Sequence, residues 1–202
     1  METLASSPER AVTLVPETGT DSLLVEAARG GDRVAFGRLY DSYARMVHGI
    51  LLARVPLSEV DDLVHDVFLL ALRQLHSLRD SRRFGAWLAA ITRNRANDYH
   101  RQSVDEVELS DTLLPDDAVQ GAPGVSQQPD DEVQFLLAII RDLPETYRET
   151  LLLRLVEGMT GPEIAQRTGL TAGSVRVNLH RGMKQLREKI ASRRSELNTR
   201  TG

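Results

Sequence analysis

The sequence of 202 residues contains no cysteine. Disulfide bonds, thiolate metal sites and cysteine nucleophiles are therefore excluded. No apolar run approaches the ~18 residues that a membrane span requires. The first ten residues, METLASSPER, lack the basic segment and apolar run of a secretory signal. These absences predict a soluble, cytoplasmic protein that does not insert into a membrane.

The usual sequence signals of an enzyme are also missing. There is no glycine-rich phosphate-binding loop, and the five histidines show no metal-binding spacing. They are His48, His65, His76, His100 and His180. We therefore expect a protein without catalytic activity, cofactor or metal. The rival interpretation, a nuclease or hydrolase, predicts hydrolysis of DNA or nucleotides when metal is supplied.

The net charge is small, but the charged residues are unevenly distributed. The net charge is −4, which by itself argues against a nucleic-acid partner. Residues 79–101, however, hold six Arg against two Asp, and residues 172–194 hold seven Lys or Arg against one Glu. Between these basic segments, residues 105–132 carry nine Asp or Glu. This alternation predicts two basic surfaces separated by an acidic tether.

Apolar residues recur at helical spacing in two blocks, and no convincing strand-like alternation is present. The first block, 21–101, has helix-capping residues at Asp32 and at the pair Ser58 and Asp61. Expected helices cover Asp21–Arg29, the segment from Asp32 to Pro56, the segment from Ser58 to about His76, and Arg83 to Arg101, with a loop at Ser77–Arg82.

Residues 102–131 contain proline and glycine among the acidic residues and have no periodicity, as expected of an interdomain linker. The second helical block is 132–194. Residues 1–20 and 195–202 are expected to be tails. The predicted fold class is therefore all-α, with two small helical domains joined by an acidic flexible linker.

The second block contains the signals of a helix-turn-helix. Thr160 and Glu163 have the spacing of a capping box, and Gly169 can adopt the left-handed conformation that ends a helix. Thr171 can cap the following basic helix, expected from Ala172 to about Lys189. Asp142 and Glu145 repeat the capping arrangement earlier in the block. A helix-turn-helix places its second helix in the DNA major groove.

Three segments in this order resemble the extracytoplasmic-function (ECF) sigma factors of bacterial transcription initiation. They are VDDLVHDVFLLAL, FGAWLAAITRNRANDYHRQ and LPETYRETLLLRLVEGMTGPEIAQRTGLTAGSVRVNLHRGMKQLRE. The resemblance covers about residues 21–101 and 132–192. It implies a non-catalytic subunit that binds core RNA polymerase at the β′ clamp and β flap, recognises promoter DNA and helps to open it. An anti-sigma protein is a candidate partner on the same grounds.

A polar face on the helix after Ser58 is opposite the apolar stripe that contains Leu63 and Val67. By resemblance this face docks on the β′ subunit, and its residues are Asp62, His65, Asp66, Leu69 and Arg73. The family usually has Gln and Glu where this chain has His65 and Asp66. The alternative is an ordinary solvated helix face.

The first basic segment is expected to recognise the melted −10 element. Capturing an extruded base requires a pocket with hydrogen-bonding groups, and holding a single strand requires basic side chains. The candidate residues are Arg79, Ser81, Arg82, Arg83, Arg93, Asn94, Asn97 and Arg101. Trp87 could stack on a base, but its spacing with Phe84 and Leu88 favours core packing.

The second basic segment is expected to read the −35 element. Side chains near the start of the recognition helix reach base edges, and later ones hold phosphates. The candidates are Ser174, Arg176, Val177, His180, Arg181 and Lys184. Arg176 can make a bidentate contact with guanine, and Val177 can contact a thymine methyl group.

Two further alternatives stay open. The acidic linker is either a solubilising tether or a segment that enters basic polymerase channels. The whole chain could instead be a dimeric helix-turn-helix regulator that acts without binding core polymerase. The second basic segment, far from the helix-turn-helix, argues against that regulator.

Overall fold

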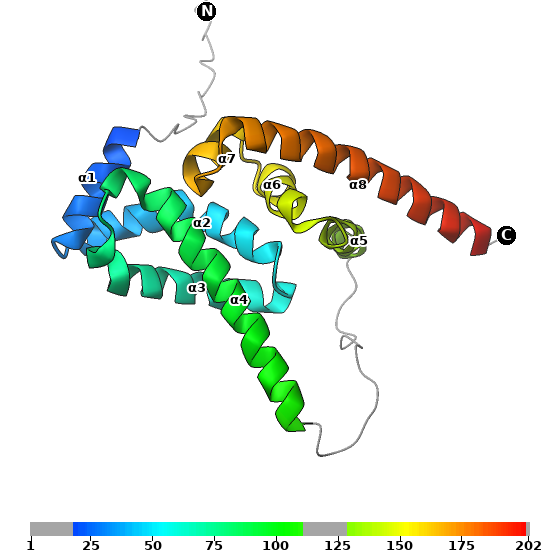
Figure 1. Cartoon of the computed structure of the whole chain (residues 1–202), viewed down its shortest axis with the longest axis horizontal. Helices are drawn as coiled ribbons and strands as arrows, with labels where there is room; N and C mark the ends of the chain where they lie inside the picture. The colour runs from blue at the N-terminus through cyan, green and yellow to red at the C-terminus, as the bar shows by residue number, and fades with distance from the viewer. Residues whose placement is uncertain (1–17, 111–128, 201–202) are drawn as a thin grey trace, which may run out of the picture.

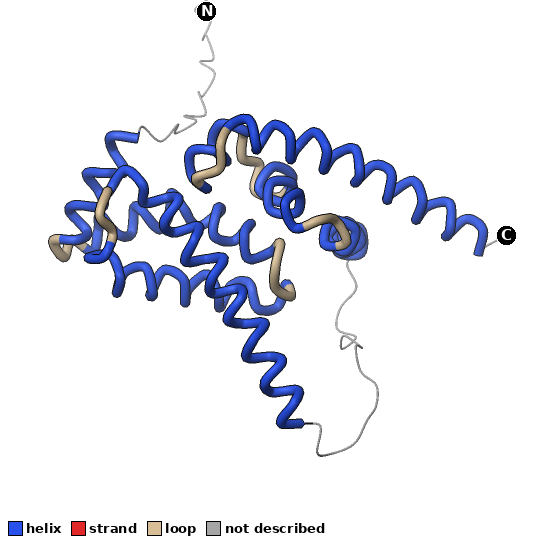
Figure 2. Tube along the Cα trace, viewed as in Figure 1, coloured by secondary structure: helices blue, strands red, loops and turns tan. Residues whose placement is uncertain are grey.

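The computed structural model describes residues 18–110 and 129–200, and all regular structure within these ranges is helical (Figures 1 and 2). The all-α prediction is confirmed. The first four helices are α1 (Thr18–Arg29), α2 (Arg33–Leu52), α3 (Leu57–Gln74) and α4 (Phe84–Ser110). Two short 3₁₀ turns, Leu75–Ser77 and Ser81–Arg83, connect α3 to α4. The last four helices are α5 (Pro129–Arg141), α6 (Glu145–Leu155), α7 (Gly161–Thr168) and α8 (Ala172–Arg200).

Helix α2 is the centre of the first bundle and contacts α1, α3 and α4. It begins where Asp32 accepts hydrogen bonds from the backbone N–H groups of Val34 and Ala35, as the sequence predicts. Its inner face is completely buried together with residues of α4, among them Leu39, Met46, Ile50, Phe84 and Leu88. Each such side chain contributes roughly 1.5–3 kcal/mol through burial, so this core fixes the position of α4.

The second bundle contains the predicted helix-turn-helix, formed by α7 and α8. The Glu163 carboxylate accepts from the Thr160 backbone N–H at 2.7 Å, and the Thr160 hydroxyl accepts from the Glu163 N–H at 3.4 Å. Gly169 ends α7 with a φ of 77°, in the left-handed region. The Thr171 hydroxyl accepts from the Ser174 N–H at 3.1 Å and caps α8. These local contacts fix the angle at which α8 leaves the turn.

The other two predicted capping pairs are wrong. Helix α3 has Pro56 at its N-cap and α6 has Pro144, and neither start has a side-chain cap. Because α3 already begins at Leu57, Ser58 lies within the first turn and its hydroxyl donates to the Glu59 carboxylate. Asp142 lies before Pro144 and accepts from Arg193 of α8 instead. The fixed φ of proline suits a helix start, but proline has no side-chain acceptor, so these two helices begin without a capping side chain.

Two of the predicted helices end too early in the sequence. Helix α4 continues past Arg101 to Ser110, and α8 continues past Lys189 to Arg200. Neither extension contains a proline or glycine that would interrupt the helix. The α4 extension occupies the first part of the predicted linker, and α5 already begins at Pro129. Residues 1–17, 111–128 and 201–202, which include most of the predicted tail and linker, lie outside the described residues.

The two bundles pack against each other, with α2 in contact with α6 and α4 in contact with α7 (Figure 1). Glycines allow this approach. A Cβ atom on Gly49 of α2 would lie 2.7 Å from a methyl group of Leu153, and one on Gly85 of α4 would lie 2.6 Å from the carbonyl oxygen of Arg167. A larger residue at either position would push the bundles apart. Among the described helices, none has the length and apolar character needed to cross a lipid bilayer.

Candidate nucleic-acid interface

The segment between α3 and α4 forms an open hollow of about 410 Å³. Asp80 organises the segment, because its carboxylate accepts from both the backbone N–H and the Nε of Arg82, each at 3.1 Å. These bonds lower the pKa of Asp80. Predicted −10 residues Arg79 and Arg83 line the hollow beside Trp87, while Ser81 is half-buried nearby. Trp87 is half-buried and its ring lies 5.8 Å from that of Phe84, so it both joins the core and faces the hollow.

The other predicted −10 residues lie along α4 and divide into two groups. Asn94, Asn97 and Arg101 are exposed and line a second open hollow with Asp98, to which Arg101 donates. Arg93 is only half-exposed and faces the second bundle, where it pairs with Glu149 of α6. The structure therefore brings three of these four side chains together and holds the fourth away from them.

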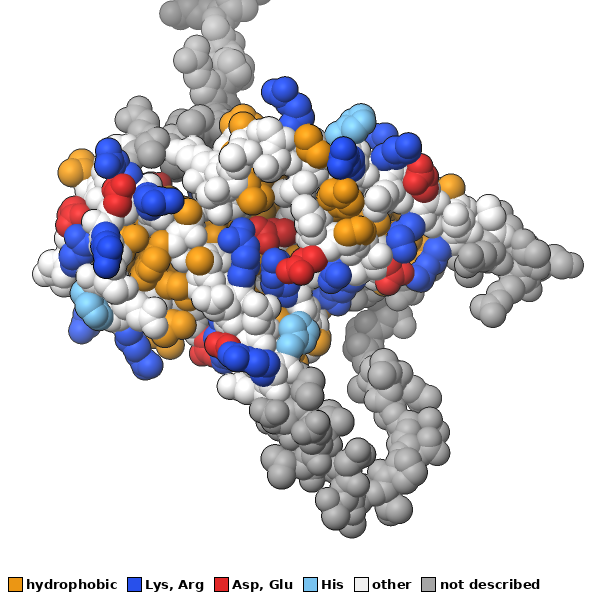
Figure 3. Space-filling view, in the orientation of Figure 1, with side chains coloured by type: hydrophobic (Ala, Val, Ile, Leu, Met, Phe, Trp, Pro, Cys, Tyr) orange, Lys and Arg blue, Asp and Glu red, His pale blue; other side chains and the backbone are white. Residues whose placement is uncertain are grey.

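The six predicted −35 residues share the outer face of α8. Ser174, Arg176, Val177, His180, Arg181 and Lys184 are all exposed. Val175, Asn178 and Leu186 on the opposite face are buried. Figure 3 shows Lys, Arg and His side chains gathered along the edge formed by α8. The arrangement presents a long, mostly basic helix face with one apolar side chain near its start.

The predicted polymerase-docking face on α3 is also exposed in full. Leu69 is 53% exposed, and Leu72, which the sequence reasoning missed, is 45% exposed. Asp66 accepts from Arg95 of α4 at 2.7 Å, and the His65 Nδ1 lies 2.8 Å from the carbonyl oxygen of Asp61. The face thus combines acidic and apolar groups, and a partner must compete with Arg95 for Asp66.

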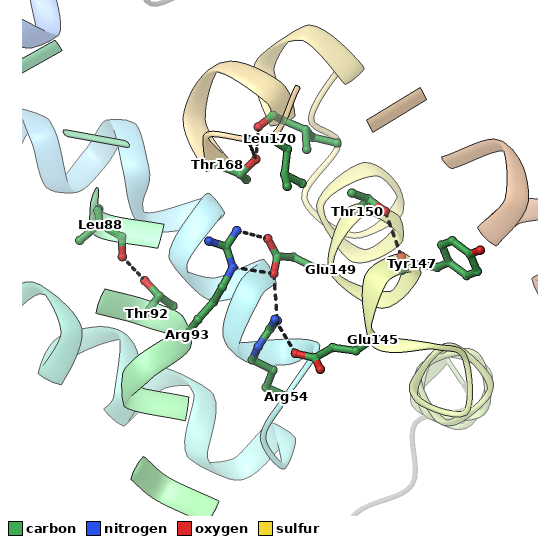
Figure 4. A network of polar contacts seen from close by, with 11 residues as sticks. Arg54, Leu88, Thr92, Arg93, Glu145, Tyr147, Glu149, Thr150, Thr168 and Leu170 are labelled. Atoms are coloured by element: carbon green, nitrogen blue, oxygen red, sulfur yellow. Dashed lines mark hydrogen bonds and ion pairs between the residues drawn. The ribbon is translucent and has the colours of Figure 1, made fainter. Parts of the chain in front are cut away.

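A buried ion network between the bundles was not found from the sequence (Figure 4). The Glu149 side chain is 7% exposed and lies between two guanidinium groups. Arg93 of α4 donates to it at 2.6 and 3.1 Å, and Nη1 of Arg54, at the end of α2, lies 2.9 Å away. Arg54 also donates to Glu145 at 2.8 Å. Helical spacing cannot reveal such pairs, because Arg93 and Glu149 are 56 residues apart.

Two further contacts join the bundles. The His48 Nδ1 lies 2.6 Å from the carboxylate of Glu157, and this hydrogen bond raises the pKa of His48 against the opposing effect of partial burial. Arg141 of α5 donates to the backbone carbonyl of Val55 at 2.8 Å and to that of Leu52 at 3.3 Å. Burial lowers the pKa of Arg141. The guanidinium of Arg141 therefore completes the hydrogen bonding at the end of α2.

Comparison with known proteins identifies both bundles. Residues 39–104 match the family Sigma-70 region 2, and residues 136–186 match Sigma-70, region 4. The ECF RNA polymerase sigma factor BldN of Streptomyces coelicolor is 32% identical over 171 residues, which cover 81% of this chain and 63% of that relative. The chain belongs to the ECF sigma factors. The ECF RNA polymerase sigma-E factor of Escherichia coli K12 is 29% identical over 184 residues, covering 85% of this sigma factor and 94% of the relative.

Solved structures share the fold. CnrH, solved in complex with the cytosolic domain of CnrY, superposes with a TM-score of 0.60 at 24% identity and covers 86% of this chain and 98% of that chain. The sigma factor RpoE of Bartonella quintana, solved with the anti-sigma factor NepR, gives a TM-score of 0.53 at 21% identity, covering 77% and 96% of the two chains. We refer below to the first bundle, α1 to α4, as region 2 and to the second, α5 to α8, as region 4.

Proposed function

We propose that this sigma factor binds core RNA polymerase and directs it to promoters, where region 4 reads the −35 element and region 2 captures the melted −10 element. The observation that supports the proposal is that each region has its own exposed face with basic side chains, one on α8 and one on the segment from Arg79 through α4. A regulator that used only its helix-turn-helix would not need the second face.

At the −35 element, the outer face of α8 enters the major groove. Arg176 and Arg181 supply guanidinium groups for guanine edges or phosphates, and the exposed Val177 supplies an apolar contact suited to a thymine methyl group. Lys184, farther along the helix, contacts the phosphate backbone. Discrimination at one base pair by a bidentate arginine is worth about 1–3 kcal/mol.

At the −10 element, the hollow beside Trp87 receives an extruded base, and Arg79, Arg82 and Arg83 hold neighbouring phosphates. The hollow is open and has polar groups from Asp80 and Ser77 in its lining, which supports recognition of a base edge. Asn94, Asn97 and Arg101 extend the contact along α4. The polymerase itself carries out the chemistry.

The exposed face of α3 docks on the β′ clamp of core polymerase. Its exposed leucines and carboxylates suit a partner surface that is apolar at its centre and basic at its edge. The β flap would bind region 4, and an anti-sigma protein stays a proposed partner by family resemblance. The proposed site of this function is the cytoplasm.

The experiment that tests the proposal is transcription in vitro with purified core polymerase on genomic fragments, followed by mapping of start sites. The expected result is initiation at defined sites only when the sigma factor is added. Sequence-specific binding to a palindromic site without polymerase, together with no effect on initiation, would instead identify a conventional regulator.

A further inference from the structure

We propose that region 4 holds the free sigma factor in an autoinhibited closed state, in which Glu149 occupies the guanidinium of Arg93 that would otherwise contact −10 DNA. The inference rests on the proposed function, since it assumes that Arg93 serves DNA binding. It adds a regulatory role for Glu149, which belongs to neither nucleic-acid face.

The chemistry of the contact makes it competitive with DNA. A carboxylate and a phosphate both accept paired hydrogen bonds from a guanidinium group. Glu149 accepts from Nε and Nη2 of Arg93, which are the donors that a phosphate would use (Figure 4). While the bundles are closed, those donors are therefore occupied, and Arg54, which also pairs with Glu145, makes a second contact with the Glu149 carboxylate.

The shape of the interface shows that closure involves more than one ion pair. Because Gly49 has no side chain, Leu153 of α6 packs directly against α2, and the backbone of Arg167 in α7 packs against Gly85 in the same way. At a third point, a Cβ on Gly169 would lie 2.6 Å from the Cβ of Ala86 in α4. The guanidinium of Arg167 also lies 5.0 Å from the ring centre of Tyr43 in α2. Close contacts at several points are expected of a packed state that is populated in the free chain.

Promoter binding would shift this equilibrium. A ligand favours whichever state it binds more tightly, so DNA that needs Arg93 favours the open chain. The apparent DNA affinity of the free protein is then reduced by the small fraction of open molecules. Core polymerase would remove that penalty if it binds the two regions only when they are apart.

The first test compares Glu149→Gln with Glu145→Gln. Both changes remove one carboxylate from α6, but Glu145 is exposed, and among the described residues its carboxylate pairs with Arg54 alone. Glu149→Gln is expected to increase the radius of gyration in small-angle scattering and to tighten binding of a labelled single-stranded −10 oligonucleotide about five- to tenfold. Glu145→Gln should change the affinity less than twofold. Equal radii and equal affinities for the two variants would overturn the closed state.

The second test locks the bundles together. A Cβ on Gly49 would lie 2.7 Å from Cδ2 and 3.4 Å from Cγ of Leu153. When Leu153 is also replaced by cysteine, the methyl groups that would collide with this Cβ are removed, and a sulfur takes the place of Cγ within bonding reach of the sulfur at position 49. The natural chain has no cysteine, so Gly49→Cys/Leu153→Cys would contain the only two thiols. The Leu153→Cys single variant and helical circular dichroism control for folding.

Oxidation of the folded pair is expected to lower oligonucleotide affinity and transcription at least tenfold, and reduction should restore both. An oxidised protein as active as the reduced one would overturn the proposal, as would a folded pair that does not form the disulfide. Absence of polymerase-dependent initiation with the natural chain would instead refute the proposed function. The scattering comparison, which needs neither polymerase nor DNA, would still decide whether the closed state exists.

Discussion

Gly85→Ala should open the two regions without weakening the helix that carries it. Gly85 lies in the first turn of α4, and an added Cβ would lie 2.6 Å from the carbonyl oxygen and 3.2 Å from the Cα of Arg167. These are backbone atoms of α7, so a side-chain rotation cannot relieve the overlap. The same Cβ would lie 2.9 Å from the buried ring of Tyr43, within region 2.

The size of the effect of Gly85→Ala depends on which free-energy contributions differ between the closed and the open chain. Alanine favours a helix over glycine by up to about 1 kcal/mol, but this gain is present in both states and cancels. The same holds for the overlap with Tyr43. The overlap with Arg167 exists only in the closed state, and inserting a methyl group into a packed interface costs about 1–3 kcal/mol. The equilibrium between closed and open chains should therefore shift by about 5- to 150-fold.

Small-angle scattering and backbone hydrogen exchange at the α2–α6 contact measure this shift directly. Gly37→Ala is the matched control, because Gly37 is also a helical glycine, but outside its own helix no atom of the described residues lies within 4 Å of an added Cβ. Gly85→Ala should increase both the radius of gyration and exchange near Gly49, whereas Gly37→Ala should change neither. If Gly85→Ala is as compact as the natural chain, the interface is more tolerant than its geometry implies and our reasoning about close packing fails.

Three further predictions concern the outer face of α8, the docking face of α3 and the interface between the two regions. Arg176→Ala should reduce transcription from cognate promoters about 5- to 150-fold, from loss of a 1–3 kcal/mol base contact, with core binding unchanged in a pull-down assay. Asp62→Arg with Asp66→Arg should do the reverse and weaken core association; normal core binding would contradict the docking face. The pKa of His48 is raised in the closed state by Glu157, aided by the charge of Asp61 and opposed by partial burial. Arg45 and His65 also line this site. The raised pKa stabilises closure below about pH 6.5, and the effect is lost as pH rises through the raised value. Scattering should therefore show expansion towards alkaline pH, and His48→Gln should remove that dependence.

Much of the helix-turn-helix could be predicted because its signals are local. Thr160, Glu163, Gly169 and Thr171 act on backbone groups within a few residues, so their spacing determines their contacts. The exposed face of α8 follows from the same periodicity. The wrong capping pair at Ser58 shows the limit of this reasoning, since a proline two residues earlier shifted the helix start.

The contact between the regions could not be predicted in the same way. Arg54 and Glu149 have the spacing of ordinary solvent-facing charges, and their burial depends on a second bundle reached through a long connection. One signal was available. Gly49 and Gly85 stand inside helices, where glycine costs about 1 kcal/mol relative to alanine and therefore often marks a close approach by another segment.

The hydrogen bonds from Arg141 to the end of α2 link the folding of one region to the presence of the other. The last carbonyl groups of a helix lack partners within the helix, and here a side chain from α5 supplies donors. When the regions separate, water must replace this side chain and the last turn of α2 should fray. A region 2 fragment expressed alone would therefore have a less ordered end at Leu52 to Val55 than the intact chain.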